Sequence, residues 1–266
     1  MHQEETDKKL INYDIDSILL DDESRKPLPF FNVYRLNCLV AGGSMSGKSS
    51  FFIKLLLNKI IEFDAIILLA PNETLKSGLY KNFINKYVDL FGDNKIMFCF
   101  NLSEEYKGLG DYKKIGRNVL QFNGLPNFND IFDLKKELEI NKNVIIFDDF
   151  ISLLNRKQWP IYYEFIHNSS RLNSNIFSLC QAIDKIPPNI RNSYNVVVLF
   201  VNYLTISNIK TLIKNTVNVL LDNDQIEYLI NYCKSNPNHH EPLIMIGGDV
   251  PFDKKIIYDN HYINFD

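Results

Sequence analysis

The stretch Gly42-Gly43-Ser44-Met45-Ser46-Gly47-Lys48-Ser49 decides how the rest of the chain is interpreted. It satisfies the pattern G-x-x-x-x-G-K-[ST] of a phosphate-binding loop, or P-loop. An apolar run over 36–41 precedes it and a helical apolar stripe follows it, so the expected order is strand, glycine loop, helix. A glycine turn that matched the pattern by chance would not need a strand before it and a helix after it. The stretch therefore predicts a site for a nucleoside triphosphate.

Each residue type in this loop has a physical role. Glycines let the backbone curl so that successive N–H groups converge on phosphate oxygens. The helix that begins near Lys48 adds its positive end to the anion site. Lys48 is expected to reach the β- and γ-phosphates, and the Ser49 hydroxyl to bind Mg²⁺. The expected nucleotide-binding residues are Gly42, Gly43, Ser44, Met45, Ser46, Gly47, Lys48, Ser49 and Ser50.

Composition limits the class of protein around the loop. The chain has 266 residues, of which 45% are hydrophobic, and a net charge of -3. This balance argues against a protein that coats nucleic acid by bulk charge, although a few basic residues in a pore would be compatible with it. The four cysteines are far apart, which favours buried thiols over disulfides or zinc. The pair His239-His240 is interpreted as part of a solvated loop.

Apolar segments alternate with helical patterns along the chain. This alternation predicts an α/β fold with a largely parallel central sheet flanked by helices. The polar segment 101–125 is expected to be a loop, and 75–91 a single helix. The expected organisation is an N-terminal arm (1–33), a P-loop core (34–205) and a C-terminal helical and β extension packed on the core (206–266). The polar start predicts no signal peptide, and no apolar run is long enough for a membrane span.

A second candidate motif lies downstream of the loop. The apolar segment Val144 to Phe147 leads into Asp148-Asp149 at the end of an expected strand. Asp148 is the expected partner of Ser49 in holding Mg²⁺. Asp149 is expected to orient or deprotonate the attacking water, a role that needs a carboxylate near the metal. The alternative is an ordinary acidic turn, but a complete P-loop upstream favours the functional interpretation.

Two further residues are candidates for the same site. Gln181 ends the next expected strand and would contact the γ-phosphate or the water, or else cap a turn. Arg171 precedes that strand. It is either a cation at a helix C-terminus or an arginine finger that completes a neighbouring subunit's site. Arg191 is a weaker candidate for the finger.

These residues, in this order, resemble a known family. The P-loop, Val144 to Asp149, Arg171, Gln181 and the run Ile186-Pro187-Pro188-Asn189-Ile190-Arg191 are similar to the FtsK–HerA superfamily of P-loop ATPases. The closer resemblance, over about 34–205, is to the genome-packaging ATPases of poxviruses and other large or midsize double-stranded DNA viruses.

The resemblance implies a RecA-like P-loop NTPase core that uses ATP and Mg²⁺. It further implies a homo-oligomeric ring that drives double-stranded DNA into a capsid, with a capsid or portal protein as partner. Asp149, Gln181 and Arg171 would be its catalytic residues. The location implied is the host cytoplasm, with association with the virion as a further option. Lys113, Lys114 and Arg117 are weak candidates for DNA contact.

Two other functions compete with this expectation. A P-loop nucleotide or small-molecule kinase needs arginines in a lid over the transferred phosphate, and no arginine-rich lid is evident. A nucleotide-gated binding module would use the P-loop but would not need a catalytic carboxylate at Asp149.

Overall fold

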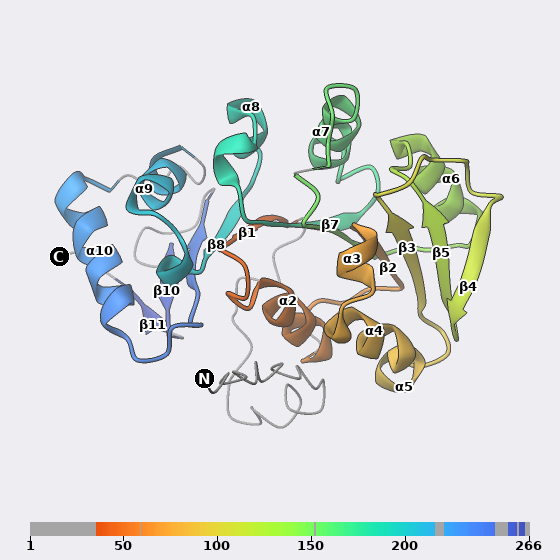
Figure 1. Ribbon diagram of the computed structural model, residues 1–266, viewed down its shortest axis with the longest axis horizontal. Coiled ribbons are helices and arrows are strands. Elements are labelled where there is room, and N and C mark those ends of the chain that lie inside the picture. Colours follow the sequence, from red (N-terminus) through yellow and green to blue (C-terminus); the bar gives the residue numbers. More distant parts are fainter. Residues whose placement is uncertain are drawn as a thin grey trace, which may run out of the picture.

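The computed structural model describes residues 36–58, 60–151, 153–215, 221–247, 255–259 and 261–263. These residues form one 11-stranded sheet with the order β11-β10-β9-β8-β1-β7-β6-β2-β3-β5-β4 (Figure 1). The arm expected at 1–33 lies outside the described residues. The strands are β1 (Asn37–Ala41), β2 (Ala65–Ala70), β3 (Ile96–Asn101), β4 (Tyr112–Gly116), β5 (Val119–Asn123), β6 (Asn143–Asp148), β7 (Ser174–Cys180), β8 (Val196–Leu199), β9 (Leu243–Ile246), β10 (Ile256–Tyr258) and β11 (His261–Tyr262).

The centre of the sheet is parallel, as predicted. The strands from β8 through β1, β7, β6, β2 and β3 to β5 all pair in parallel. Every residue of β2 and β6 is buried, which explains why both read as unbroken apolar runs. Because these strands point the same way, the loops after them meet at one edge of the sheet, the carboxyl edge.

Both ends of the sheet are antiparallel. At one end β4 pairs with β5, so the prediction of a loop over 101–125 was wrong. The edge strand β4 carries exposed polar residues and has no apolar alternation, and its sequence therefore gives no strand signal. At the other end β9 pairs with β8 and continues into β10 and β11. The C-terminal extension thus shares the sheet of the P-loop strand.

Helices cover both faces of the sheet (Figure 1). Leu39 packs into a core with α6 to α10, whereas its neighbours Cys38 and Val40 pack into a second core with α2 to α5. This alternation follows from the two-residue period of a strand. The helices are α2 (Lys48–Leu57), α3 (Asn72–Leu75), α4 (Gly78–Asn85), α5 (Tyr87–Phe91), α6 (Phe128–Glu137), α7 (Trp159–His167), α8 (Pro188–Arg191), α9 (Ile206–Asn215) and α10 (Asn223–Ser235), with short 3-10 turns at η2 (Ile183–Lys185) and η3 (Val201–Tyr203).

The single helix expected over 75–91 is in fact three short helices. The Ser77 hydroxyl accepts a hydrogen bond from the Tyr80 amide and so caps the start of α4. This cap interrupts an apolar pattern that is otherwise helical throughout. Asp222 and Gln225 form a capping box at the start of α10.

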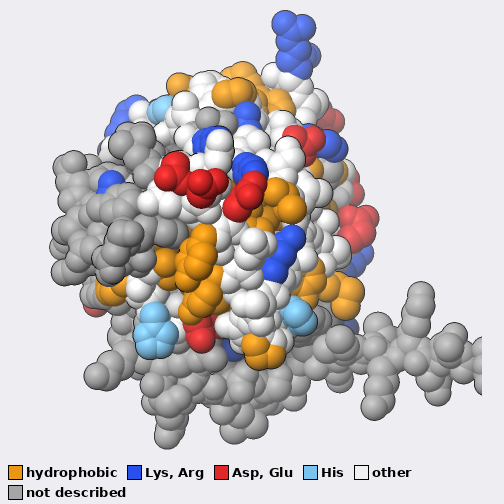
Figure 2. Space-filling view, turned by 90° about the vertical axis from the view of Figure 1, so that its left-hand side faces the viewer, with side chains coloured by type: hydrophobic (Ala, Val, Ile, Leu, Met, Phe, Trp, Pro, Cys, Tyr) orange, Lys and Arg blue, Asp and Glu red, His pale blue; other side chains and the backbone are white. Residues whose placement is uncertain are grey.

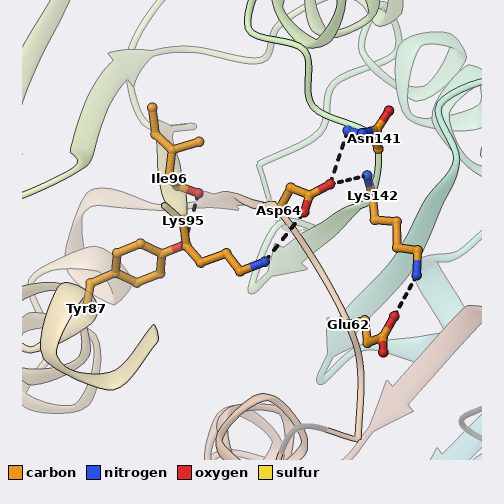
Figure 3. A network of polar contacts seen from close by, with 7 residues as sticks. All are labelled: Glu62, Asp64, Tyr87, Lys95, Ile96, Asn141 and Lys142. Atoms are coloured by element: carbon orange, nitrogen blue, oxygen red, sulfur yellow. Dashed lines mark hydrogen bonds and ion pairs between the residues drawn. The ribbon is translucent and has the colours of Figure 1, made fainter. Parts of the chain in front are cut away.

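A polar network fixes the opposite, amino edge of the sheet (Figure 3). Asp64, just before β2, accepts hydrogen bonds from the amides of Asn141 (3.2 Å) and Lys142 (2.8 Å), just before β6. Its other oxygen pairs with Lys95 Nζ at 3.5 Å, just before β3. One carboxylate thus connects the starts of three neighbouring strands and sets their register.

The face at the α10 end of the molecule carries side chains of mixed character (Figure 2). At the α10 end of the molecule, separate hydrophobic patches lie among acidic and basic side chains, and basic residues do not gather into one area (Figure 2). Within the described part of the chain, no helix has the length and apolar character needed to cross a membrane.

Candidate nucleotide-binding site

The P-loop connects β1 to α2 at the carboxyl edge of the sheet. Gly47 immediately precedes α2 with φ of 100°, a left-handed conformation that strongly favours glycine. A Cβ on Gly42 would lie 2.5 Å from Ser46 Oγ and 2.9 Å from Phe200 Cβ. The two fixed glycines of the motif are therefore needed for different reasons. Gly47 adopts a left-handed conformation, and at Gly42 a side chain would collide with Ser46 and Phe200.

The start of α2 presents unsatisfied amides, as an anion site requires. The first helical hydrogen bond joins the Phe51 amide to the Gly47 carbonyl at 2.8 Å. The amides of Lys48, Ser49 and Ser50 precede that bond and have no carbonyl of the helix to pair with. Three amides of the loop already have backbone partners. Gly42 donates to the Cys180 carbonyl at 3.2 Å, Gly43 to the Tyr203 carbonyl at 3.1 Å and Ser46 to the Gly43 carbonyl at 3.4 Å.

Lys48 is buried within the loop it follows. Its Nζ donates to the carbonyls of Gly42 (2.9 Å) and Gly43 (2.8 Å), which leaves one of three ammonium protons for another acceptor. Burial lowers the pKa of Lys48, while the carboxylates of Asp149 and Asp148 act in the opposite direction. The ammonium is thus held beside the loop and faces two negative charges.

Asp148, the last residue of β6, lies against the P-loop helix. Its Oδ2 accepts a hydrogen bond from the Ser49 hydroxyl at 2.7 Å and another from the Tyr80 hydroxyl at 2.6 Å. Burial, followed by the charge of Asp149, raises the pKa of Asp148 to about 6. The two residues predicted to share a magnesium ion are therefore in direct contact, around a carboxylate that is costly to ionise.

Asp149 points to different partners. Its Oδ1 accepts from Gln181 Nε2 at 2.9 Å, and its Oδ2 accepts from the Thr74 hydroxyl at 3.4 Å. Asp149 has φ of 49°, a left-handed conformation that is uncommon outside glycine and asparagine. This backbone turn directs the two neighbouring carboxylates to separate positions. Strained backbone of this kind is concentrated at functional sites.

Arg171 lies away from the loop. Arg171 precedes β7, whose seven residues separate it from Gln181 by about 20 Å along the strand. It is exposed, and its guanidinium lies 5.5 Å from the centre of the Phe128 ring. Since α7 ends at His167, Arg171 is not in the last turn of a helix and that interpretation was wrong. Arg191 ends α8, and its Nε is buried with no hydrogen-bond partner among the described residues.

Sequence reasoning missed several residues of the site. Thr74 follows the carboxyl end of β2, so the rule that ligand groups gather at such ends could have found it. Tyr80 had no usable signal, because a buried tyrosine in an apolar pattern resembles a core residue. His240 had been placed in a solvated loop. It is exposed, but its Nδ1 lies 3.2 Å from the Ser46 carbonyl of the P-loop.

Comparison with known proteins gives a structural likeness only. No protein-family model and no curated protein sequence matches the chain. Among solved structures, the genome packaging NTPase B204 from Sulfolobus turreted icosahedral virus 2 in complex with AMP has a TM-score of 0.52 and 13% identity, over 87% of this chain and 100% of that chain. The same NTPase with ATP-gammaS has a TM-score of 0.47 and 14% identity, over 87% and 100%. The chain thus has the α/β fold of a P-loop NTPase, with a mostly parallel sheet flanked by helices.

Proposed function

We propose that this chain is a Mg²⁺-dependent ATPase that drives double-stranded DNA into a viral capsid. One observation carries the enzymatic part: two consecutive carboxylates after β6 have different partners. Asp148 contacts the P-loop serine, and Asp149 contacts the glutamine at the end of β7. A site that only bound a nucleotide would need the first arrangement but not the second.

The residues around Ser49 suit a magnesium ion. Ser49 and Asp148 both offer oxygen atoms, the ligands Mg²⁺ prefers. Ser49 lies in the first turn of α2, which would hold the phosphates, and Asp148 contacts it from the end of β6. Magnesium bound there would neutralise negative charge on the β- and γ-phosphates. Among the described residues no group of three or more His, Cys, Asp or Glu side chains could hold a metal by itself, so the phosphates would supply the remaining ligands.

Asp149 is the proposed general base or water-positioning residue. Its carboxylate is held from both sides by Gln181 and Thr74, and it does not contact Ser49 in the way Asp148 does. A carboxylate beside the metal site, but not bound to the metal, can accept a proton from an attacking water or orient it. The Gln181 side chain would form a hydrogen bond with the same water or with the γ-phosphate. Arg171 is proposed to act on a neighbouring subunit's nucleotide.

The packaging part of the proposal extends the printed function of the structural neighbour to this chain. It is supported by the motif order that the chain shares with viral packaging ATPases. The proposed assembly is a homo-oligomeric ring with a P-loop core (34–205) and a C-terminal extension (206–266), acting on double-stranded DNA with a capsid or portal protein. Such an enzyme would work inside the infected cell, at the site of virion assembly.

ATP hydrolysis, measured with and without double-stranded DNA, tests the proposal directly. We expect Mg²⁺-dependent release of phosphate that DNA stimulates. Lys48→Ala should abolish nucleotide binding. Asp149→Asn should still bind ATP and lower kcat by about 100-fold or more, the usual scale of general-base catalysis. Full activity in Asp149→Asn would overturn the role given to that residue.

Two other results would replace the proposed function. Phosphorylation of an added acceptor, without stimulation by DNA, would indicate a kinase. Tight ATP binding with no hydrolysis, even in the presence of DNA, would indicate a nucleotide-gated binding module. Lys136→Ala, at the exposed end of α6, is a suitable control because it leaves the P-loop edge untouched.

A further inference from the structure

An aromatic pair lies beside the P-loop and takes no part in the proposed chemistry. The rings of Tyr203 and His240 are stacked, with centroids 5.5 Å apart and an interplanar angle of 27°. Tyr203 ends the η3 turn after β8, whereas His240 lies in the loop between α10 and β9. We refer to this pair as the aromatic platform. It brings together two segments that are distant in the sequence.

Two hydrogen bonds join the platform to the P-loop, and a third loop residue, Gly47, lies close to it. The Tyr203 carbonyl accepts from the Gly43 amide at 3.1 Å. His240 Nδ1 lies 3.2 Å from the Ser46 carbonyl, which can only accept, so Nδ1 carries the proton in that bond. A Cβ on Gly47 would lie 3.8 Å from the same imidazole nitrogen. The two rings therefore border the loop directly.

Sheet order places the platform opposite the catalytic carboxylates. Strand β1 leads into the P-loop and lies between β7 and β8. Gln181 follows β7, and Asp148 and Asp149 follow β6 on the same side. The platform follows β8 and so lies on the other side of the loop.

A bound nucleotide has a direction across this site. A magnesium ion held by Ser49 and Asp148 would neutralise charge on the β- and γ-phosphates, so the γ end of the triphosphate is expected near these two residues. The nucleoside must then leave the loop on the side away from these carboxylates. That side carries the platform. His240 is exposed, and Tyr203 stacks on its ring.

We infer that the aromatic platform of Tyr203 and His240 binds the nucleobase of the nucleotide held by the P-loop. Stacking on aromatic rings suits any base, since each base has a π face. This inference rests on the proposed function, because it assumes that the P-loop holds a nucleoside triphosphate. The competing role is mechanical: His240 would only brace the loop through Ser46.

Comparing ATP with inorganic tripolyphosphate separates these possibilities, because tripolyphosphate has the phosphates but no base. Binding of both to the full chain with Mg²⁺ would be measured by calorimetry. In Tyr203→Ala and His240→Ala we expect ATP affinity to fall about 10- to 100-fold, in the range found for base stacking. Tripolyphosphate affinity should stay at the wild-type value. His240→Phe keeps a ring but loses the bond to Ser46, and it should retain most of the preference for ATP.

Controls keep the result specific. Tyr112→Ala removes another exposed aromatic residue, on β4 at the far end of the sheet, and should change neither affinity. If His240→Ala lowered the affinities for ATP and tripolyphosphate equally, His240 would only support the P-loop through Ser46, and the inference would be overturned. Unchanged ATP affinity in both platform variants would also overturn it. If the wild-type chain bound neither ligand, the proposed function itself would fail, a result distinct from these two.

Discussion

Asp148 is a buried carboxylate whose ionised form costs the fold free energy. Its pKa is raised to about 6, mainly by burial and next by Asp149, so between about pH 4 and pH 6 the folded state binds a proton that the unfolded state releases. Stability from this group therefore falls as the pH rises through that window. At pH 7.5 the carboxylate is ionised, and the folded chain bears the full free-energy cost of burying its charge. Binding the metal nucleotide would recover part of it.

Asp148→Asn should for this reason stabilise the chain in the absence of nucleotide. We expect the free energy of unfolding at pH 7.5 to rise by about 1–2 kcal/mol, since the neutral amide avoids the cost of burying a charge. The gain should shrink at pH 5, where the wild-type carboxylate is already protonated. Urea unfolding at both pH values measures it. A lower free energy of unfolding at pH 7.5 would contradict this account.

Tyr80→Phe should have the opposite effect. It removes the hydroxyl that donates to Asp148 at 2.6 Å and leaves the rest of the ring in place. Loss of a hydrogen bond to a charged group costs about 1.5–3 kcal/mol, so the free energy of unfolding at pH 7.5 should fall by that amount. The loss should be smaller at pH 5, where the acceptor is neutral. Equal losses at pH 5 and pH 7.5 would indicate a packing defect instead.

At the scale of elements, Asp64 fixes the starts of strands β2, β3 and β6 (Figure 3). Burial by itself would raise its pKa, but hydrogen bonds from the Lys142 amide and the charge of Lys95 outweigh burial and lower the pKa below its ordinary value. A lowered pKa gives stability that is present above the unfolded value, near 3.9, and is lost as the pH falls through the folded value.

Asp64→Asn should therefore weaken the amino edge of the sheet at neutral pH. The free energy of unfolding at pH 7 should fall by about 1 kcal/mol, a value discounted because the side chain is partly exposed. The difference from wild type should shrink as the pH falls below the unfolded value near 3.9. Denaturant unfolding across this range is the measurement, with Glu62→Gln, which alters only an exposed ion pair, as the control. A loss of the same size at pH 7 and at every lower pH would argue against the charge as its cause.

The sequence was most informative where burial is complete. Strands β1, β2 and β6 are apolar at nearly every position because helices cover both faces of the sheet, and the P-loop and Asp148 follow at their predicted ends. The hairpin of β4 and β5 could not be predicted in the same way, because an edge strand needs no apolar pattern. The contact of His240 with Ser46 joins residues 194 positions apart, and only the pairing of β9 with β8 brings them together.

At the scale of the molecule, the position of Arg171 limits how it could act. Arg171 lies at the amino edge of the sheet, while the P-loop lies at the carboxyl edge. It is therefore too distant for the nucleotide of its own subunit, and it could act only across an interface that joins unlike edges of two copies. Head-to-tail contacts of this kind close into rings when the rotation between copies allows it. The proposed ring and the proposed arginine finger thus depend on the same interface.

Mixing inactive variants tests this interface. Arg171→Ala should lower kcat by about 1,000-fold, at the low end of the range for arginine fingers, and Lys48→Ala should bind no nucleotide. In a ring made from both variants, an intact P-loop on the Arg171→Ala subunit can face an intact Arg171 on the Lys48→Ala subunit. We therefore expect the mixture to regain activity that neither variant has alone. Lys142→Ala, which disrupts an exposed ion pair with Glu62 at the same edge of the sheet, is the control and should keep wild-type kcat. If mixing restored nothing, or if Arg191→Ala lost activity while Arg171→Ala kept it, Arg171 would not be the residue that completes the neighbouring site.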